Sequence, residues 1–197
     1  MPGRGPEKSD SLTVRVQRKF PDARSVHRLD MSTSGLLVFA RGADMHQRLS
    51  CLFRERAVKK SYIAIVSGRV GSTAGEIELP LASDWPNRPR QKVDFAIGKP
   101  SLTRYLLLDD LKYPAHVCKH HDGGDLTACR VQLEPVTGRT HQLRVHMAAI
   151  GHPVLGDELY GGSVGNNSQR LLLHARKLTF IHPLREELLT LTSAAPF

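Results

Sequence analysis

The sequence predicts an α+β fold, in which a mixed and largely antiparallel sheet is flanked by a few helices. Many segments show the short apolar or alternating pattern of strands, and few show the spacing of helices. The helical segments do not alternate with strands as repeated βαβ units require. With 197 residues, of which 40% are hydrophobic and 24% are charged, the chain suffices for one well-filled domain.

Two amphipathic helices are predicted near the start of the chain, because apolar residues recur three or four positions apart. The residues that mark them are Leu12, Val16 and Phe20 within 11–20, and then Met45, Leu49, Leu52 and Phe53. Apolar or alternating runs predict strands at 35–41, 60–66, 76–81, 91–97, 103–108, 126–133, 171–181 and 188–192.

A third helix is predicted after residue 140. Thr140 is its candidate N-cap, and a glycine and a proline shortly beyond residue 150 supply the stop signal. The apolar residues that share one face are Leu143, Met147 and Ile150. Arg144 lies one residue round from this face, in a half-desolvated setting where a guanidinium pairs strongly with a carboxylate.

The charge balance favours a polyanionic partner, since 28 Lys and Arg residues against 19 acidic residues give a formal charge of +9. Residues 1–10 are expected to be a flexible start and 11–197 one domain, because no repeat or linker divides them. Three cysteines, no hydrophobic leader and no apolar run of membrane-spanning length predict a cytoplasmic protein. We expect a monomer without an obligate protein partner.

The residues most suggestive of chemistry are 27–30, His-Arg-Leu-Asp. They place the carboxylate of Asp30 beside two groups that can carry positive charge, ahead of a small polar run at 32–35 and an apolar run at 36–40. An acid at the lip of a buried strand is a common place for a nucleophile or a general base. Taken alone, the tetrad is also compatible with a surface ion pair of little consequence.

Four segments together resemble motifs of the RluA family of RNA pseudouridine synthases. They are His-Arg-Leu-Asp at 27–30, Lys-Lys-Ser-Tyr-Ile-Ala at 59–64, PVTGRTHQLRVHMAAIGHPVLGD at 135–157, and Leu-Leu-Leu-His-Ala at 171–175 with Phe-Ile-His-Pro at 180–183. The resemblance spans 11–197 and implies an α+β catalytic domain with a central RNA-binding cleft. Residues 84–93 further resemble the branch that modifies large-subunit ribosomal RNA and the anticodon stem-loop of some transfer RNAs.

The resemblance implies an isomerisation that needs no cofactor. Uridine becomes pseudouridine when the bond from uracil N1 to ribose C1′ breaks, the base turns and C5 takes the place of N1, without redox change. The implied catalytic aspartate is Asp30, and attack on C6, attack on C1′ and a glycal route all require it to be ionised. Arg144 is the implied partner that keeps this carboxylate charged, and a helix-surface arginine is the alternative.

The resemblance assigns further roles around the target uridine. Tyr62 stacks on the base and offers its hydroxyl for proton transfer, unless it is only a core tyrosine. Leu143 forms part of the apolar wall of the pocket, unless it is a core leucine. Arg28 fills the space left by the flipped uridine, unless it neutralises Asp30 or Asp157.

Many basic residues are candidate phosphate contacts, since neutralising the backbone supplies much of the affinity for RNA. They are Arg15, Arg18, Lys19, Arg24, Arg54, Arg56, Lys59, Lys60, Arg88, Arg90, Lys92 and Arg139. Trp85, Arg88 and Arg90 are the preferred recognition residues, because they share a proline-punctuated loop suited to base stacking.

Other patterns give weaker hypotheses. Four residues are possible zinc ligands, but their spacing matches no common finger and no metal is expected: Cys118, His120, His121 and Cys129. Three histidines are expected to pack on the third helix or to face RNA: His141, His146 and His152.

The start of the chain departs from the family pattern. Family members carry a strand and turn with an Asn-Lys-Pro-like motif upstream of His-Arg-Leu-Asp, and too few residues precede His27 for it. An uncovered sheet edge and apolar surface are therefore expected. A catalytically silent RNA-binding or RNA-folding module is the alternative interpretation. A zinc nucleobase deaminase is disfavoured, because the sequence lacks its His-x-Glu and Pro-Cys-x-x-Cys motifs.

Overall fold

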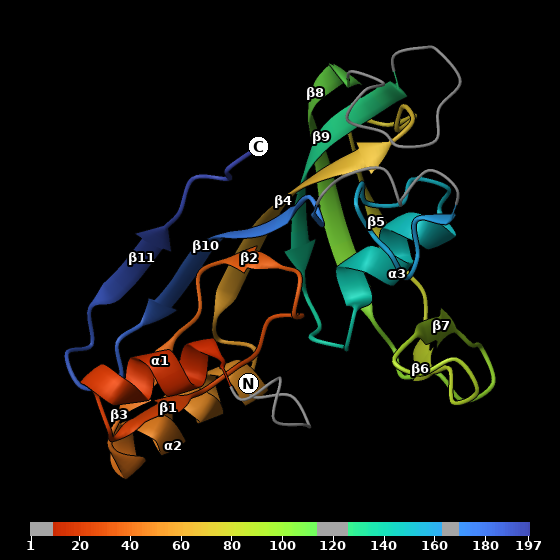
Figure 1. Ribbon diagram of the computed structural model, residues 1–197. Helices are drawn as coiled ribbons and strands as arrows, with labels where there is room; N and C mark the ends of the chain where they lie inside the picture. The colour runs from red at the N-terminus through yellow and green to blue at the C-terminus, as the bar shows by residue number, and fades with distance from the viewer. Residues whose placement is uncertain (1–9, 114–125, 163–169) are drawn as a thin grey trace. The chain divides into compact units, whose positions relative to one another are not determined.

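The computed structural model describes residues 10–113, 126–162 and 170–197, which divide into two compact units (Figure 1). The smaller unit comprises 10–29, Leu36–Lys59 and Leu178–Thr192. The larger unit comprises Asp30–Gly35, Ser193–Phe197 and the described part of Lys60–Lys177. Asp30, Tyr62 and Arg144, which are predicted to be catalytic, therefore lie in the larger unit. A single domain over 11–197 stays a prediction.

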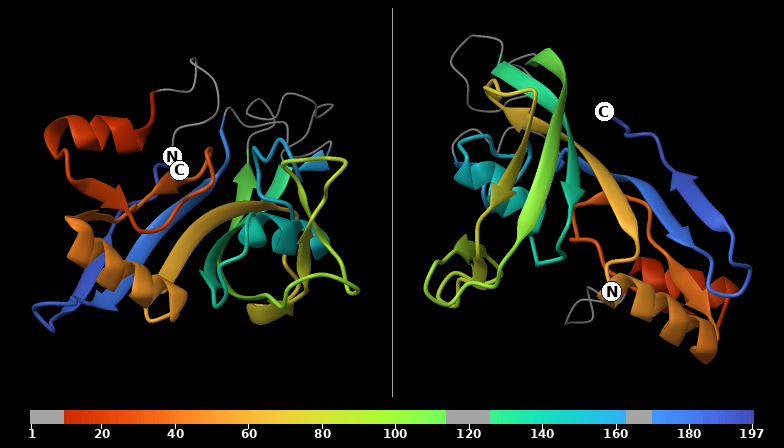
Figure 2. Two further views of the ribbon diagram at one scale, coloured as in Figure 1. Left: turned by 90° about the horizontal axis from the view of Figure 1, so that it is seen from below. Right: turned by 180° about the vertical axis from the view of Figure 1, so that it is seen from behind.

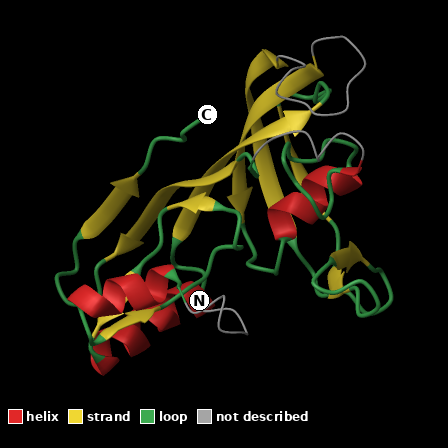
Figure 3. Ribbon diagram, in the orientation of Figure 1, coloured by secondary structure: helices red, strands yellow, loops and turns green. Residues whose placement is uncertain are grey.

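Short strands and two helices make up the smaller unit. Its elements are α1 (Leu12–Lys19), β1 (Ala23–Ser25), β3 (Phe39–Arg41), α2 (Ala43–Arg54) and β11 (Leu188–Thr192). Helix α1 lies beside β1, helix α2 lies beside β3, and the two strands pair antiparallel (Figure 3). The side chain of Ser11 accepts a hydrogen bond from the Val14 N–H and caps α1. Both predicted amino-terminal helices are confirmed.

Most of the sheet belongs to the larger unit. Its elements are β2 (Ser34–Gly35), β5 (Ala74–Glu78), β6 (Leu81–Ser83), β7 (Gln91–Val93), β8 (Leu102–Tyr113), β9 (Leu126–Pro135) and α3 (Gln142–Ala149). It also contains all of β4 (Lys59–Ser67) except Lys59, and the part of β10 (Leu173–Ile181) before Leu178. Neighbouring strands run in the order β10-β4-β9-β8-β5, with β2 parallel to β10 and with antiparallel pairs from β4 to β5. Strands β6 and β7 form a separate antiparallel hairpin. The predicted mixed, mostly antiparallel sheet is confirmed.

Helix α3 packs beside β8 and β9, as two further views show (Figure 2). Its Leu143 and Met147 belong to the core that β4 and β9 build, and Arg144 and His146 are buried as well. The prediction of one apolar face is therefore wrong, because the helix is enclosed on several sides. The imidazole of His146 is buried, with Nε2 3.1 Å from the Leu79 carbonyl oxygen. This burial lowers the pKa of the imidazole.

The beginning of α3 also differs from the prediction. His141, not Thr140, is the residue before the helix, and it adopts a left-handed backbone conformation with φ of 52°. Gln142 organises this turn from inside the helix. Its side-chain oxygen accepts hydrogen bonds from the Thr137 hydroxyl (2.7 Å) and the Arg139 N–H (3.0 Å), so the buried amide fixes the loop that enters α3.

Several predicted strands have different limits in the structure. The segment 35–41 splits into β2 and β3, because β2 pairs with β10 and β3 pairs with β1. The segment 76–81 is divided between β5 and β6. Strand β7 ends at Val93, because the Asp94 carboxylate accepts hydrogen bonds from the backbone N–H groups of Ala96 (3.0 Å) and Ile97 (3.1 Å) and turns the chain.

Candidate active site around Asp30

Backbone pairing positions Asp30 at the start of a tight turn. Its carbonyl oxygen accepts a hydrogen bond from the Thr33 N–H at 3.0 Å. The next two residues form β2, in which Ser34 pairs with His174 and Gly35 pairs with Ala175. Gly35 has φ of 108°, and a Cβ there would lie 2.3 Å from the Ala175 carbonyl oxygen. Only glycine permits this close approach, so the sequence after Asp30 anchors the carboxylate to β10.

Side chains strengthen this anchor. The Ser34 hydroxyl lies 2.9 Å from His174 Nδ1 and accepts a hydrogen bond from the Arg170 guanidinium at 2.8 Å. On its other side, His174 Nε2 lies 3.1 Å from the Ser193 hydroxyl. Burial lowers the pKa of His174, which favours the neutral imidazole in this network. The motif at 171–175 thus holds the turn that carries Asp30.

Arg144 joins two carboxylates. It donates to both oxygens of Asp157, from Nε and from Nη2, each at 2.7 Å. Its remaining nitrogen, Nη1, donates to Asp30 Oδ2 at 3.3 Å. The Arg144 and Asp157 side chains are 7% and 0% exposed, whereas that of Asp30 is 19% exposed. The predicted contact between Arg144 and Asp30 is present, but the stronger, bidentate partner of the arginine is Asp157.

The two carboxylates keep Arg144 charged despite its burial. Burial lowers the pKa of Arg144, but its hydrogen bonds and attraction to Asp157 and Asp30 outweigh that effect and raise the pKa. Asp157 is itself held by the backbone N–H groups of Leu159 and Tyr160, each 3.0 Å from Oδ1. The guanidinium is therefore fixed before any substrate arrives.

Tyr62 lies in β4 opposite Leu133 and is partly buried against the core. Burial, and then the negative charge of Asp30, raise the pKa of Tyr62 to about 12. The hydroxyl consequently keeps its proton at neutral pH. The structure places Arg144 in contact with Asp30, and Asp30 close enough to Tyr62 to raise its pKa. The catalytic roles of the three residues stay predictions.

Two residues that were not predicted as site residues complete this neighbourhood. The Tyr160 hydroxyl accepts a hydrogen bond from the Gln91 N–H at 2.7 Å and lies 2.6 Å from His141 Nδ1. His141 Nε2 lies 3.9 Å from Asp30 Oδ1, and the Arg144 guanidinium lies 5.0 Å from the centre of the Tyr160 ring. The sequence offered one signal for His141, its place within the long motif at 135–157, and none for Tyr160.

The remaining predicted residues occupy different settings. Leu143 is 7% exposed and packs in the core, and Arg139 donates from Nε to the Pro100 carbonyl oxygen at 3.3 Å. Arg28 has an exposed side chain and belongs to the smaller unit. The roles of Leu143 in the pocket wall, of Arg139 in phosphate contact and of Arg28 in base flipping stay predictions.

The proposed recognition loop closes the hairpin of β6 and β7. Trp85 is 64% exposed, and the Arg88 guanidinium lies 4.1 Å from the centre of its ring and donates from Nε to its carbonyl oxygen at 3.3 Å. Next to this loop, the Gln91 N–H reaches the Tyr160 hydroxyl. The first residue of β7, which follows the loop, is thus hydrogen-bonded to Tyr160.

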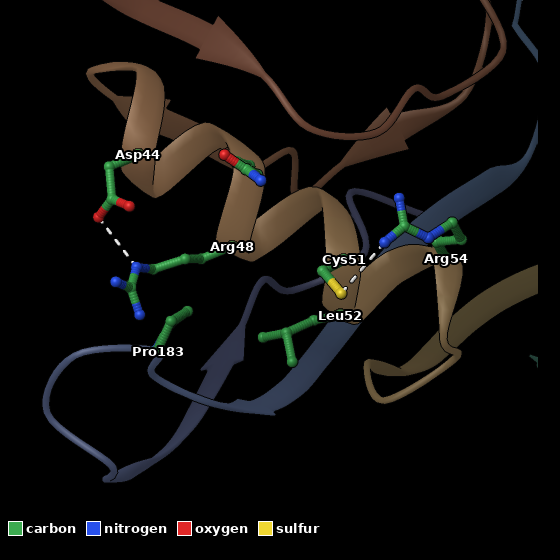
Figure 4. A pocket seen from close by; sticks show the side chains of 7 residues that line it. Asp44, Arg48, Cys51, Leu52, Arg54 and Pro183 are labelled. Carbon is green, nitrogen blue, oxygen red and sulfur yellow. Dashed lines mark hydrogen bonds and ion pairs between the residues drawn. The ribbon is translucent and has the colours of Figure 1, made fainter.

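A hollow of about 550 Å³ lies on α2 of the smaller unit (Figure 4). Arg48 pairs with Asp44 at 2.9 Å, and Arg54 donates to Cys51 Sγ at 3.3 Å. None of the predicted catalytic residues lines it. Its lining residues are Asp44, Gln47, Arg48, Cys51, Leu52, Arg54 and Pro183.

Of the four possible zinc ligands, the structure describes Cys129. Cys118, His120 and His121 lie outside the described residues. Cys129 is buried in the core, with its thiol 3.2 Å from the Gly68 carbonyl oxygen. Among the described residues, no helix has the length and apolar character to cross a membrane.

Comparison with known proteins identifies the family. The profile of the family described as RNA pseudouridylate synthase matches residues 5–149. The chain belongs to this family. The dual-specificity RNA pseudouridine synthase RluA of Escherichia coli (strain K12) is 46% identical over 198 residues, which cover 100% of this chain and 84% of that protein. The protein of the same name from Yersinia pestis is 48% identical over 93% of this chain and 83% of its own length.

A solved structure supports the same assignment. Human RNA Pseudouridylate Synthase Domain Containing 1 matches with a TM-score of 0.79 and 33% identity, over 95% of this chain and 75% of that chain. The pseudouridine synthase fold and the predicted RluA-family membership are therefore confirmed. The chain is an RNA pseudouridine synthase, an isomerase that acts on RNA.

Proposed function

We propose that this synthase uses Asp30 as its catalytic carboxylate and acts on uridines of large-subunit ribosomal RNA and of a transfer RNA anticodon stem-loop. The observation that carries the proposal is that Asp30 is both partly exposed and paired with Arg144. Its side chain is 19% exposed, so a nucleotide can reach it, and a buried guanidinium lies 3.3 Å away. The dual-specificity relatives and the Trp85 loop support the choice of RNA.

The surrounding residues divide the work of the reaction. Arg144 stabilises the ionised form of Asp30, which each possible route to glycosidic bond cleavage requires. Asp157 balances the charge of the buried guanidinium and fixes its orientation. Tyr62, protonated at neutral pH, stacks against the uracil and holds a proton close to the turning base.

The target uridine must leave its stack before Asp30 reaches it, which costs a few kcal/mol of unstacking. In this proposal Arg28 occupies the space that the flipped base leaves, since its guanidinium can stack between bases. The Trp85 ring, with Arg88 above it, offers a stacking surface and positive charge for the surrounding RNA. We further propose a cytoplasmic monomer.

Pseudouridine mapping tests the proposed substrates. Ribosomal and transfer RNA are mapped from cells with the gene, without it, and without it but carrying the Asp30→Asn variant. We expect defined sites in large-subunit ribosomal RNA and in an anticodon stem-loop to vanish together and to return only with the parent protein. Loss of sites in one RNA class only would contradict dual specificity, and return of the sites with Asp30→Asn would contradict the role of Asp30.

A further inference from the structure

We propose that His141 is a positioning residue for Asp30, and that Tyr160 determines which nitrogen of His141 carries the proton. The inference rests on the proposed role of Asp30. Both residues lie in the larger unit with Asp30, and the His141 side chain is 10% exposed. The structure thus places an imidazole edge, and not only a guanidinium, at the catalytic carboxylate.

The structure fixes the direction of one of the two hydrogen bonds that Tyr160 makes, and the proposal assigns the other. The backbone N–H of Gln91 can only donate, so the Tyr160 oxygen accepts this bond. The proposal assigns the single hydroxyl proton of Tyr160 to the 2.6 Å contact with His141 Nδ1. With this assignment Nδ1 is the acceptor nitrogen, and in the neutral imidazole the proton resides on Nε2.

This tautomer places an N–H donor toward Asp30. His141 Nε2 lies 3.9 Å from Asp30 Oδ1, whereas Arg144 reaches the other oxygen, Oδ2, at 3.3 Å. Each carboxylate oxygen thus faces one donor. At 3.9 Å the His141 contact is longer than a hydrogen bond, and the proposal requires it to shorten when a substrate binds at Asp30.

The backbone of His141 permits a sharp test. Its φ of 52° is a conformation that most side chains avoid and that asparagine adopts readily. Asparagine would therefore preserve the turn, but its amide ends at the Nδ1 position and offers no N–H at the Nε2 position. Glutamine fits the turn less well, but it can carry an N–H at the Nε2 position. If His141 serves only the turn, asparagine should replace it better. If His141 donates to Asp30, glutamine should replace it better.

The charged and titratable groups that face Asp30 define the expected pH response. Among the described residues they are the Arg144 guanidinium, with Asp157 behind it, the Tyr62 and Tyr160 hydroxyls, and His141 itself. Burial raises the pKa of both tyrosines, so neither carries charge at neutral pH. Because His141 Nε2 faces Asp30 Oδ1, we expect variants that lack this donor to show an acid limb of the activity profile at higher pH.

The experiment compares His141→Asn and His141→Gln in single-turnover assays across pH, with an RNA that the parent modifies. We expect His141→Asn to fold like the parent, to lose activity by about tenfold and to need higher pH. His141→Gln should retain more activity and an acid limb closer to that of the parent. Parent-like rates and pH dependence in His141→Asn, or a better rescue by asparagine than by glutamine, would overturn the proposal.

Tyr160→Phe tests the second part without touching the turn. It keeps the ring against Arg144 and removes the hydroxyl that sets the tautomer, so the acid limb should move in the same direction. Tyr105→Phe, which removes a tyrosine hydroxyl elsewhere in the larger unit, should leave the profile unchanged. An unshifted profile in Tyr160→Phe would contradict the assigned tautomer.

The same assay separates this inference from the proposed function. An active Asp30→Asn variant would refute the role of Asp30. An inactive Asp30→Asn variant beside parent-like His141 and Tyr160 variants would refute only the positioning role.

Discussion

Arg144 gives two of its nitrogens to Asp157 and only one to Asp30. The two bonds to Asp157 are 2.7 Å long, and the bond to Asp30 is 3.3 Å long. The buried charge of Arg144 is therefore balanced chiefly by Asp157, whose side chain is 0% exposed. Asp30 is left with a fixed positive neighbour and with part of its carboxylate open to a nucleotide.

Double-mutant cycles on folding stability should reflect this division. Removing either partner of the buried pair orphans the other, so Arg144→Ala and Asp157→Ala should each lower the free energy of unfolding by about 3–5 kcal/mol. Asp30→Asn should lower it far less. The interaction energy from urea denaturation should be larger for Arg144 with Asp157 than for Arg144 with Asp30. Equal interaction energies would contradict the unequal pairing.

Tyr62→Phe should slow or stop turnover while RNA binding persists, because the ring remains and the hydroxyl is lost. The raised pKa adds a second expectation. Between about pH 10 and pH 12 the unfolded chain loses the Tyr62 proton before the folded chain does, so folding stability falls as pH rises. Tyr62→Phe should remove up to about 3 kcal/mol of this alkaline loss. Unchanged turnover and an unchanged alkaline slope would make Tyr62 a packing residue only.

Gly35→Ala should disrupt the anchor of Asp30. A Cβ at Gly35 would meet the Ala175 backbone at 2.3 Å in a left-handed conformation. We expect a loss of about 3 kcal/mol or more in the free energy of unfolding, and reduced activity. Gly42→Ala is the matched control, since Gly42 also has positive φ but meets nothing within 4 Å. That change should cost only about 1–2 kcal/mol. Similar losses in both variants would argue against close packing at β2.

Replacing Arg88 and Arg90 with Ala should weaken RNA binding and flatten its salt dependence. Each lost phosphate contact removes about 0.7–0.9 from the slope of log K against log salt. Arg104→Ala removes an exposed arginine that is paired with Glu76 in the sheet, and it serves as the control. An unaltered slope in the double variant would place the RNA-binding surface elsewhere.

Local signals in the sequence were enough for the helices at 12–19 and 43–54 and for most strands, because period and length are local properties. They were not enough for 35–41, where different partner strands divide one apolar run. Partner choice depends on distant residues, which periodicity does not encode. The same reason explains the limits of β5 and β6.

The candidate site was predictable where a motif named the residue and not where tertiary contact defines it. Asp30, Tyr62 and Arg144 were identified from motifs, and the structure brings them together. The bidentate role of Asp157 depends on how the chain returns after α3. The roles of His141 and Tyr160 depend on a left-handed turn and on a hairpin N–H, which leave no pattern in the sequence.

The most direct test of the central claim is a single-turnover measurement of pseudouridine formation by Asp30→Asn, with RNA affinity measured on the same preparation. The substitution removes the charge of the carboxylate and little of its shape. We expect no pseudouridine and an RNA affinity within a few-fold of the parent. Full activity in a folded Asp30→Asn protein would contradict the active site described for this synthase.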